Sequence, residues 1–150
     1  MINFTDSLKL GMQTALDRER NFQEIHDIFL TLKEQILEFS NNLVKLELVF
    51  QENPDDDNSV VDYFENLTNL YSDKSLCLTD VNNLHNYEWL SFINFSSNGY
   101  PCTISIDGNQ FDSIDKISLE ENIKKLLSAP STGQKLFQLI KSAKENKKAL

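Results

Sequence analysis

The sequence predicts an α+β fold, in which an antiparallel sheet of about four strands is covered by a long N-terminal helix, or a helix pair, and two C-terminal helices. Three observations carry this prediction: a helical apolar stripe near the N-terminus, alternating segments separated by tight turns between residues 87 and 113, and two helix-start signals after residue 117. Because the chain has 150 residues, 40% of them apolar, residues 1–150 are expected to form one domain.

Residues 5–40 are expected to be helical, with Thr5 or Asp6 capping the start. Apolar residues recur there at alternating spacings of three and four, which keeps them on one side of a helix: Phe22, Ile25, Phe29, Leu32, Ile36 and Phe39. The same side is expected to continue toward the N-terminus through Leu8, Met12 and Ala15. The polar run at residues 17–21 leaves open a break into two helices. We expect the stripe to pack on the chain's own sheet rather than on a second copy, because it is shorter than the three to four heptads typical of a coiled coil.

The middle of the chain predicts a strand followed by a loop. Apolar and polar residues alternate in Leu43–Phe50, which predicts a half-buried strand with Lys45 and Glu47 on its exposed side. Residues 51–59 contain a proline and four acidic residues and predict a loop. The chain before residue 85 is expected to add three smaller elements: a short helix in residues 60–70, a short strand at Ser75–Thr79 and a turn at Asn82-Asn83.

The clearest strands lie between residues 87 and 113. Three segments show the alternation or the aromatic content typical of strands: Tyr87–Phe95, Tyr100–Ile106 and Gln110–Ser113. They are separated by Asn98-Gly99 and Asp107-Gly108, dipeptides that favour the positive φ of tight hairpin turns. The three segments therefore predict an antiparallel meander.

Two helices are expected at the C-terminal end. The segments Ser118–Glu121 and Ser131–Gln134 match the capping box, in which two side chains satisfy backbone N–H groups at a helix start. Pro130 is expected to end the first of these helices. The second is expected to fray into the lysine-rich tail at residues 141–150.

The charge of the chain limits its partners. The sequence has 23 acidic and 14 basic residues, and its last ten residues hold four of the lysines and one glutamate. Residues 1–140 therefore carry 22 acidic and 10 basic side chains, a net charge of −12. Such a surface repels nucleic acid and anionic lipid and speeds encounter with a basic partner. We expect a basic protein as the partner, no direct binding of nucleic acid or membrane, and a monomer or weak homodimer.

The sequence offers little for catalysis. It contains no nucleophile-elbow, zinc-protease or phosphate-binding motif. The histidines are the only side chains that ordinarily titrate near neutrality; His26 has no carboxylate facing it across a helix, and His85 lies in a predicted turn. Cys77 and Cys102 are too far apart for a CxxC site and are expected to be buried thiols. The chain is therefore predicted not to be an enzyme and to bind no cofactor or metal.

Targeting signals are also missing from this sequence. The first residues lack the basic and apolar regions of a signal peptide, and no apolar run exceeds three residues. We therefore expect a cytoplasmic location.

Two groups of residues are the predicted partner contacts. The first is an acidic group in the proline-containing loop: Glu52, Asp55, Asp56 and Asp57. The second joins His85 to Tyr87 and Tyr100, which are expected near adjoining strand ends with Trp89 and Phe95. Aromatic residues edged by acids are frequent in protein interfaces, and this composition favours a binding role.

The strand-turn-strand segment Trp89–Ile106, with its Asn98–Pro101 turn, and the capped helices that follow through Ser131–Leu136 lie in about the last 65 residues. In general character this acidic chain resembles bacterial immunity proteins of the contact-dependent inhibition type, which neutralise toxins. The resemblance implies direct binding of a basic toxin, such as a nuclease, through an acidic surface. Two other interpretations stay open: a phage-type anti-defence inhibitor that mimics nucleic-acid charge, and a structural adaptor that dimerises through the Phe22–Phe39 stripe.

Overall fold

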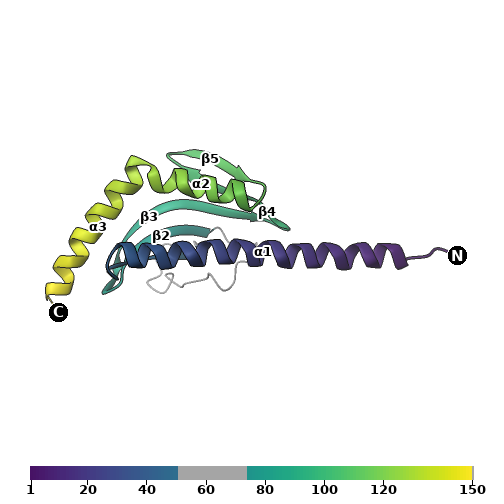
Figure 1. Cartoon of the computed structure of the whole chain (residues 1–150), viewed down its shortest axis with the longest axis horizontal. Coiled ribbons are helices and arrows are strands. Elements are labelled where there is room, and N and C mark those ends of the chain that lie inside the picture. The colour runs from purple at the N-terminus through teal and green to yellow at the C-terminus, as the bar shows by residue number, and fades with distance from the viewer. Residues whose placement is uncertain (51–73, 150) are drawn as a thin grey trace.

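A computed structural model describes residues 1–50 and 74–149 and confirms the α+β fold (Figure 1). The elements follow in the order α1 (Thr5–Phe39), β1 (Val44–Phe50), β2 (Lys74–Asp80), β3 (Asn83–Ser96), β4 (Gly99–Ile106), β5 (Asn109–Ser113), α2 (Lys116–Ser128) and α3 (Pro130–Ala149). The described sheet has five strands instead of about four, because β1 and β2 both join the predicted meander.

The sheet is antiparallel throughout, with the strand order β1-β2-β3-β4-β5. The turn between β4 and β5 is formed by Asp107 and Gly108, both with positive φ, as the sequence predicts. The turn between β3 and β4 is shifted by one residue: Ser97 and Asn98 form it, and Gly99 follows with a φ of 89°. The register shifts between Phe95, which pairs with Cys102, and Ser96, which pairs with Gly99, so two residues of β4 are left without a partner in the register.

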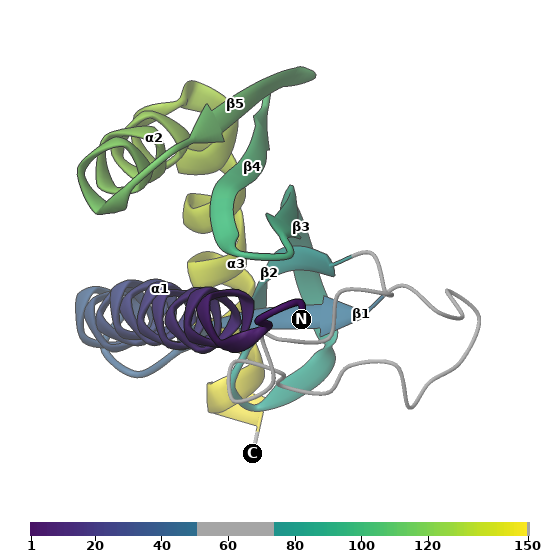
Figure 2. The ribbon, with the colours of Figure 1, turned by 90° about the vertical axis from the view of Figure 1, so that its right-hand side faces the viewer.

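All three helices pack on the sheet. α1 contacts β1 and β4, α2 contacts β4 and β5, and α3 crosses β1, β2 and β3. Figure 2 shows α1 and α2 lying side by side on the same side of the sheet, with a gap between their axes. The core fills the space between helices and strands, and its fully buried side chains include Phe29, Leu46, Leu78, Ile104 and Leu119.

α1 is a single helix of 35 residues, without a break at the polar run. Its apolar stripe is buried only from Phe22 to Ile36. The expectation of burial at both ends was wrong, because Leu8, Met12 and Phe39 are about 70% exposed. α1 is longer than the sheet that it packs on, so its N-terminal part extends past the sheet (Figure 1).

The helix starts differ from the predicted ones. α1 has no side-chain cap from Thr5 or Asp6; instead, the backbone N–H of Thr5 donates to Asn3 Oδ1 at 2.9 Å. α2 begins three residues earlier than predicted, because Asp115 and Ser118 form the capping box. Pro130 stands at the first position of α3, where its missing N–H costs little.

The first two strands expose little of either face, and in β1 the residues Lys45 and Val49 are half-buried. β1 was predicted to expose Glu47, yet this residue is only 3% exposed. Its carboxylate lies 2.8 Å from Lys45 Nζ and accepts a hydrogen bond of 3.2 Å from Thr79 Oγ1. These partners compensate the charge, so alternation on β1 does not mark a solvent-facing side. Every residue of β2 is buried as well.

Candidate partner-binding surface

The predicted acidic contacts Glu52, Asp55, Asp56 and Asp57 lie outside the described residues. Their charge is nevertheless informative in the sequence. Residues 51–73 contain seven acidic residues and no Lys or Arg, whereas the rest of the chain has 16 acidic and 14 basic residues. Most of the net charge of −9 therefore belongs to this one segment.

The predicted aromatic contacts do not form one cluster. His85 and Tyr87 are exposed near the start of β3, where Tyr87 pairs with Thr79 of β2. Tyr100 lies at the start of β4, which pairs with the other end of β3 through Cys102 and Phe95 and through Gly99 and Ser96. Phe95 is eight positions along β3 from Tyr87, which corresponds to about 26 Å. The long β3 thus places Tyr87 and Tyr100 on different parts of the surface, contrary to the expected proximity.

Tyr100 instead faces α1. Its hydroxyl donates a hydrogen bond of 2.8 Å to Glu24 Oε1. Partial burial and the neighbouring Glu24 carboxylate raise the pKa of Tyr100 above its ordinary value, so the hydroxyl keeps its proton. This bond fixes the Glu24 side chain at the edge of a groove, which the sequence did not reveal.

The groove runs between α1 and the C-terminal helices, and we call it the helical groove. It consists of two adjoining hollows of about 480 and 320 Å³ that share Leu32, Gln35 and Leu127. Apolar side chains from all three helices line it: Ile28, Leu32, Ile36, Phe39, Ile123, Leu127 and Leu136. Along α1 it extends from Glu24 to Phe39, about 22 Å at 1.5 Å per residue.

The two sides of the helical groove differ in charge. The α1 side carries the carboxylates of Glu24 and Asp27. The α2 side carries Lys116 and Lys124, but each lysine has a glutamate of its own helix within 4 Å, at 3.9 and 3.2 Å respectively. The uncompensated charge of the groove is therefore negative and lies along α1.

A second surface is the N-terminal arm, by which we mean residues 5–16 of α1. Every residue of the arm is exposed. Large apolar side chains are more than half exposed at Phe4, just before the arm, and at Leu8, Leu10, Met12 and Leu16 within it. Exposed apolar patches of this kind often mark interaction sites. The sequence pattern identified Leu8 and Met12 as apolar-stripe residues but assigned them to the core.

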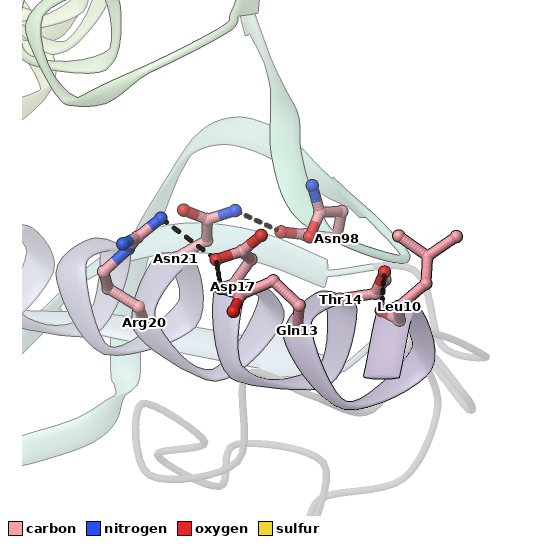
Figure 3. Close-up of polar contacts among 7 residues, drawn as sticks. All are labelled: Leu10, Gln13, Thr14, Asp17, Arg20, Asn21 and Asn98. Atoms are coloured by element: carbon pink, nitrogen blue, oxygen red, sulfur yellow. Dashed lines mark hydrogen bonds and ion pairs between the residues drawn. The ribbon is translucent and has the colours of Figure 1, made fainter. Parts of the chain in front are cut away.

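Polar contacts hold the base of the arm against the body. The Asp17 carboxylate accepts hydrogen bonds from Gln13 and Arg20, at 3.0 and 3.3 Å, on one side of α1 (Figure 3). Asn21 donates to the backbone oxygen of Asn98 at 3.0 Å, and Arg18 donates to that of Ser97 at 2.8 Å. These bonds join α1 to the β3–β4 turn at the point where the arm leaves the sheet.

A third hollow of about 490 Å³ lies beside Trp89, between β3, β4 and the start of α3. Lys135, which lines this hollow, donates a hydrogen bond of 2.6 Å to the backbone oxygen of Trp89. The Lys135 Nζ also lies 5.4 Å from the centre of the Trp89 ring. Because Lys135 is engaged in this way, the hollow offers less charge to a ligand than its lining residues suggest.

The described residues contain no group of three or more His, Cys, Asp or Glu side chains that could hold a metal ion. The half-buried His26 of α1 lies 3.5 Å from Asp27, and the exposed His85 lies on β3. Both cysteines are buried, and burial raises the pKa of Cys77 to about 11 and of Cys102 to about 12. Neither thiol is therefore activated as a nucleophile.

In comparisons with known proteins, no family model, no curated protein and no solved structure matches this chain. Among the helices that the structure describes, none is sufficiently long and apolar to span a membrane.

Proposed function

We propose that this chain is an acidic protein-binding inhibitor that neutralises a basic toxin, such as a nuclease, by direct binding in the cytoplasm. The observation that carries the proposal is the helical groove, which combines an apolar lining with the carboxylates of Glu24 and Asp27. A helix or loop of the toxin can bury apolar side chains in such a groove, while its Lys or Arg side chains pair with the α1 side.

The charge distribution supports a basic partner. The seven acidic residues of the segment 51–73, which include the predicted contacts Glu52, Asp55, Asp56 and Asp57, attract cations over distances longer than a direct contact. Because the rest of the chain has a net charge of only −2, this attraction comes mainly from one segment of the sequence and not from the chain as a whole. Attraction by one segment raises the association rate and favours encounters in which the partner meets that segment.

The proposal is tested with the protein encoded beside the gene for this chain. We expect that protein to be toxic when produced alone in bacterial cells and harmless when co-produced with this chain. The purified proteins are expected to form a one-to-one complex by calorimetry. A neighbouring protein that is toxic but neither bound nor neutralised contradicts the proposal.

A pair of matched variants tests the groove itself. Phe39 lines the groove and is 72% exposed, whereas Phe137 is 70% exposed and lines none of the three hollows. Phe39→Glu is expected to weaken toxin binding by more than about 1 kcal/mol, because it replaces an apolar groove contact with a charge, whereas Phe137→Glu leaves binding unchanged. Equal effects of the two variants argue against the groove.

A second candidate function is inhibition of a nucleic-acid-binding defence enzyme by charge mimicry. It is favoured by the seven acidic residues without a basic residue in the segment 51–73. A mimic occupies the nucleic-acid site of its target, so a DNA duplex should compete with the chain for the captured partner. Absence of competition favours the immunity function.

The adaptor interpretation needs a different surface from the one first considered. Residues Phe22–Ile36 of the stripe are packed in the core, so the folded chain does not offer them to a partner. Among the exposed large apolar side chains of α1, those of the N-terminal arm form the largest group that self-association can use.

A further inference from the structure

One continuous apolar ridge runs along the N-terminal arm and begins at Phe4, just before it. Phe4, Leu8, Met12 and Leu16 follow one another at intervals of four residues and are 65%, 68%, 69% and 57% exposed. Residues four apart are neighbours on a helix surface, so these side chains form a single row. We call this row the arm ridge.

The ridge is related to the core stripe. Leu8 and Ala15 precede Phe22 by multiples of seven residues, and Phe29 and Ile36 follow at the same interval. Positions seven apart lie on nearly the same side of a helix, with a drift of about 20° per heptad. The face that α1 buries against the sheet therefore continues onto the arm, where no described residue of the chain covers it.

The charge of the arm indicates what kind of molecule binds there. Residues 1–16 contain Asp6 and Lys9 as their only charged side chains, so the arm is neutral, whereas the remainder of the chain carries the whole net charge of −9. A basic protein gains little electrostatic attraction from the arm. Two copies of an acidic chain repel each other elsewhere but can meet at this neutral ridge with little like-charge cost.

From these observations we propose that the arm ridge binds the arm ridge of a second copy of this chain. When rows of side chains spaced four residues apart pack against each other, the axes of the two helices cross at about −50°. A two-fold axis between Leu8 and Met12 places Leu8 of each copy against Met12 of the other. The same axis places Phe4 of each copy on the side of Leu16 of the other, because the four ridge residues are spaced symmetrically about residue 10. The ridge is thus self-complementary, as a two-fold contact requires.

The contact is small. An arm of 12 residues is about 18 Å long, and stable interfaces bury about 800 Å² on each partner. Two crossed arms reach only part of that area, so we expect a weak dimer in reversible exchange with the monomer. The proposal is independent of toxin binding, since the helical groove lies on the opposite half of α1.

Sedimentation velocity of the purified full chain over a wide range of concentration tests the dimer. The wild type is expected to shift from monomer to dimer as concentration rises. The double variant Leu8→Glu/Met12→Glu is expected to raise the dissociation constant at least about tenfold, because a buried unpaired carboxylate is strongly unfavourable. Leu10→Glu is the control: Leu10 is also 68% exposed but is turned about 200° from both ridge residues. A wild type that stays monomeric, or equal effects of the two variants, overturns the proposal.

Disulfide crosslinking tests the geometry. A mixture of the single variants Leu8→Cys and Met12→Cys is expected to give more crosslinked dimer than either variant alone, and Leu10→Cys is expected to give little. The native Cys77 and Cys102 are buried and do not interfere. Crosslinking that is equal at all three positions contradicts the crossed ridges. Binding of the arm to neutral phosphatidylcholine vesicles without self-association would assign it to lipid and also overturn the proposal.

Discussion

Asp80, at the end of β2, accepts a hydrogen bond of 2.9 Å from Asn146, in the last turns of α3. The Asp80 side chain is fully buried and also accepts hydrogen bonds from Asn86 Nδ2 and from the backbone N–H of Asn82. One carboxylate thus joins the β2–β3 turn, β3 and α3. This contact lies within the lysine-rich part of α3, which is helical to Ala149.

Asp80→Ala is expected to destabilise the fold by about 2 kcal/mol, because the charge-assisted bonds are lost and their donors are left without that acceptor. Chemical denaturation measures the loss, and faster amide hydrogen exchange is expected in residues 141–149. Asp112→Ala is the control, since Asp112 is exposed and accepts a single side-chain bond from Thr103. Its cost should be about 0.5 kcal/mol or less. Equal costs would show that Asp80 does not join these elements.

Gly99→Ala is expected to destabilise the fold more than Gly108→Ala. Both glycines have positive φ, so an alanine at either position is strained by about 1–2 kcal/mol. At Gly99 the new Cβ would also lie 3.1 Å from Asn21 Cβ, whereas at Gly108 it meets nothing within 4 Å. The difference in unfolding free energy between the two variants therefore measures how tightly α1 packs on the β3–β4 turn. Equal losses would mean that this contact adjusts freely.

Neutralising the acidic group by Glu52→Gln, Asp55→Asn, Asp56→Asn and Asp57→Asn is expected to slow association with the proposed toxin partner more than it speeds dissociation. Salt should remove the difference from wild type, because the Debye length is only about 8 Å at physiological ionic strength. Binding kinetics in a salt series provide the measurement. A control variant neutralises four exposed acids elsewhere: Glu19, Glu34, Glu38 and Glu145. Identical rates for wild type and the first variant at every salt concentration would exclude the acidic group as a contact.

The thiols of Cys77 and Cys102 are expected to resist alkylation in the folded protein and to react after unfolding. Burial raises their pKa to about 11 and about 12 from an ordinary 9.0, so the folded state keeps protons that the unfolded state loses. The contribution of these thiols to stability is therefore complete below pH 9.0 and declines as the pH rises toward 11. A thiol reagent at neutral pH and unfolding curves up to pH 11 test both statements. Rapid labelling of the native protein would contradict them.

Local pattern predicted the elements better than it predicted their surroundings. The apolar spacing of α1 and the Asp107-Gly108 turn depend on neighbouring residues and were predicted correctly. Burial of Leu8, by contrast, depends on how far the sheet extends beneath the helix, which the spacing does not encode. Glu47 shows the same limit, because its compensation by Lys45 and Thr79 depends on pairing with a distant strand.

The surface was predicted least well. Tyr87 and Tyr100 were expected near adjoining strand ends, but Tyr87 lies near the start of the long β3, whereas β4 begins beside its other end. The helical groove combines residues that are about one hundred positions apart, such as Asp27 and Lys124, and no local pattern joins them. The start of α2 could have been placed correctly, since Asp115 precedes Ser118 at capping-box spacing.

The N-terminal arm and the C-terminal end of α3 lie at opposite ends of the long axis of the molecule (Figure 1). Four lysines, Lys141, Lys144, Lys147 and Lys148, make the α3 end electropositive. The chain therefore has an electric dipole as well as a net charge, and a basic protein that diffuses toward it is turned away from the α3 end. In a dimer joined through the arms, the two positive ends would point outward. The direction from which a basic protein approaches each copy would therefore be the same as in the monomer.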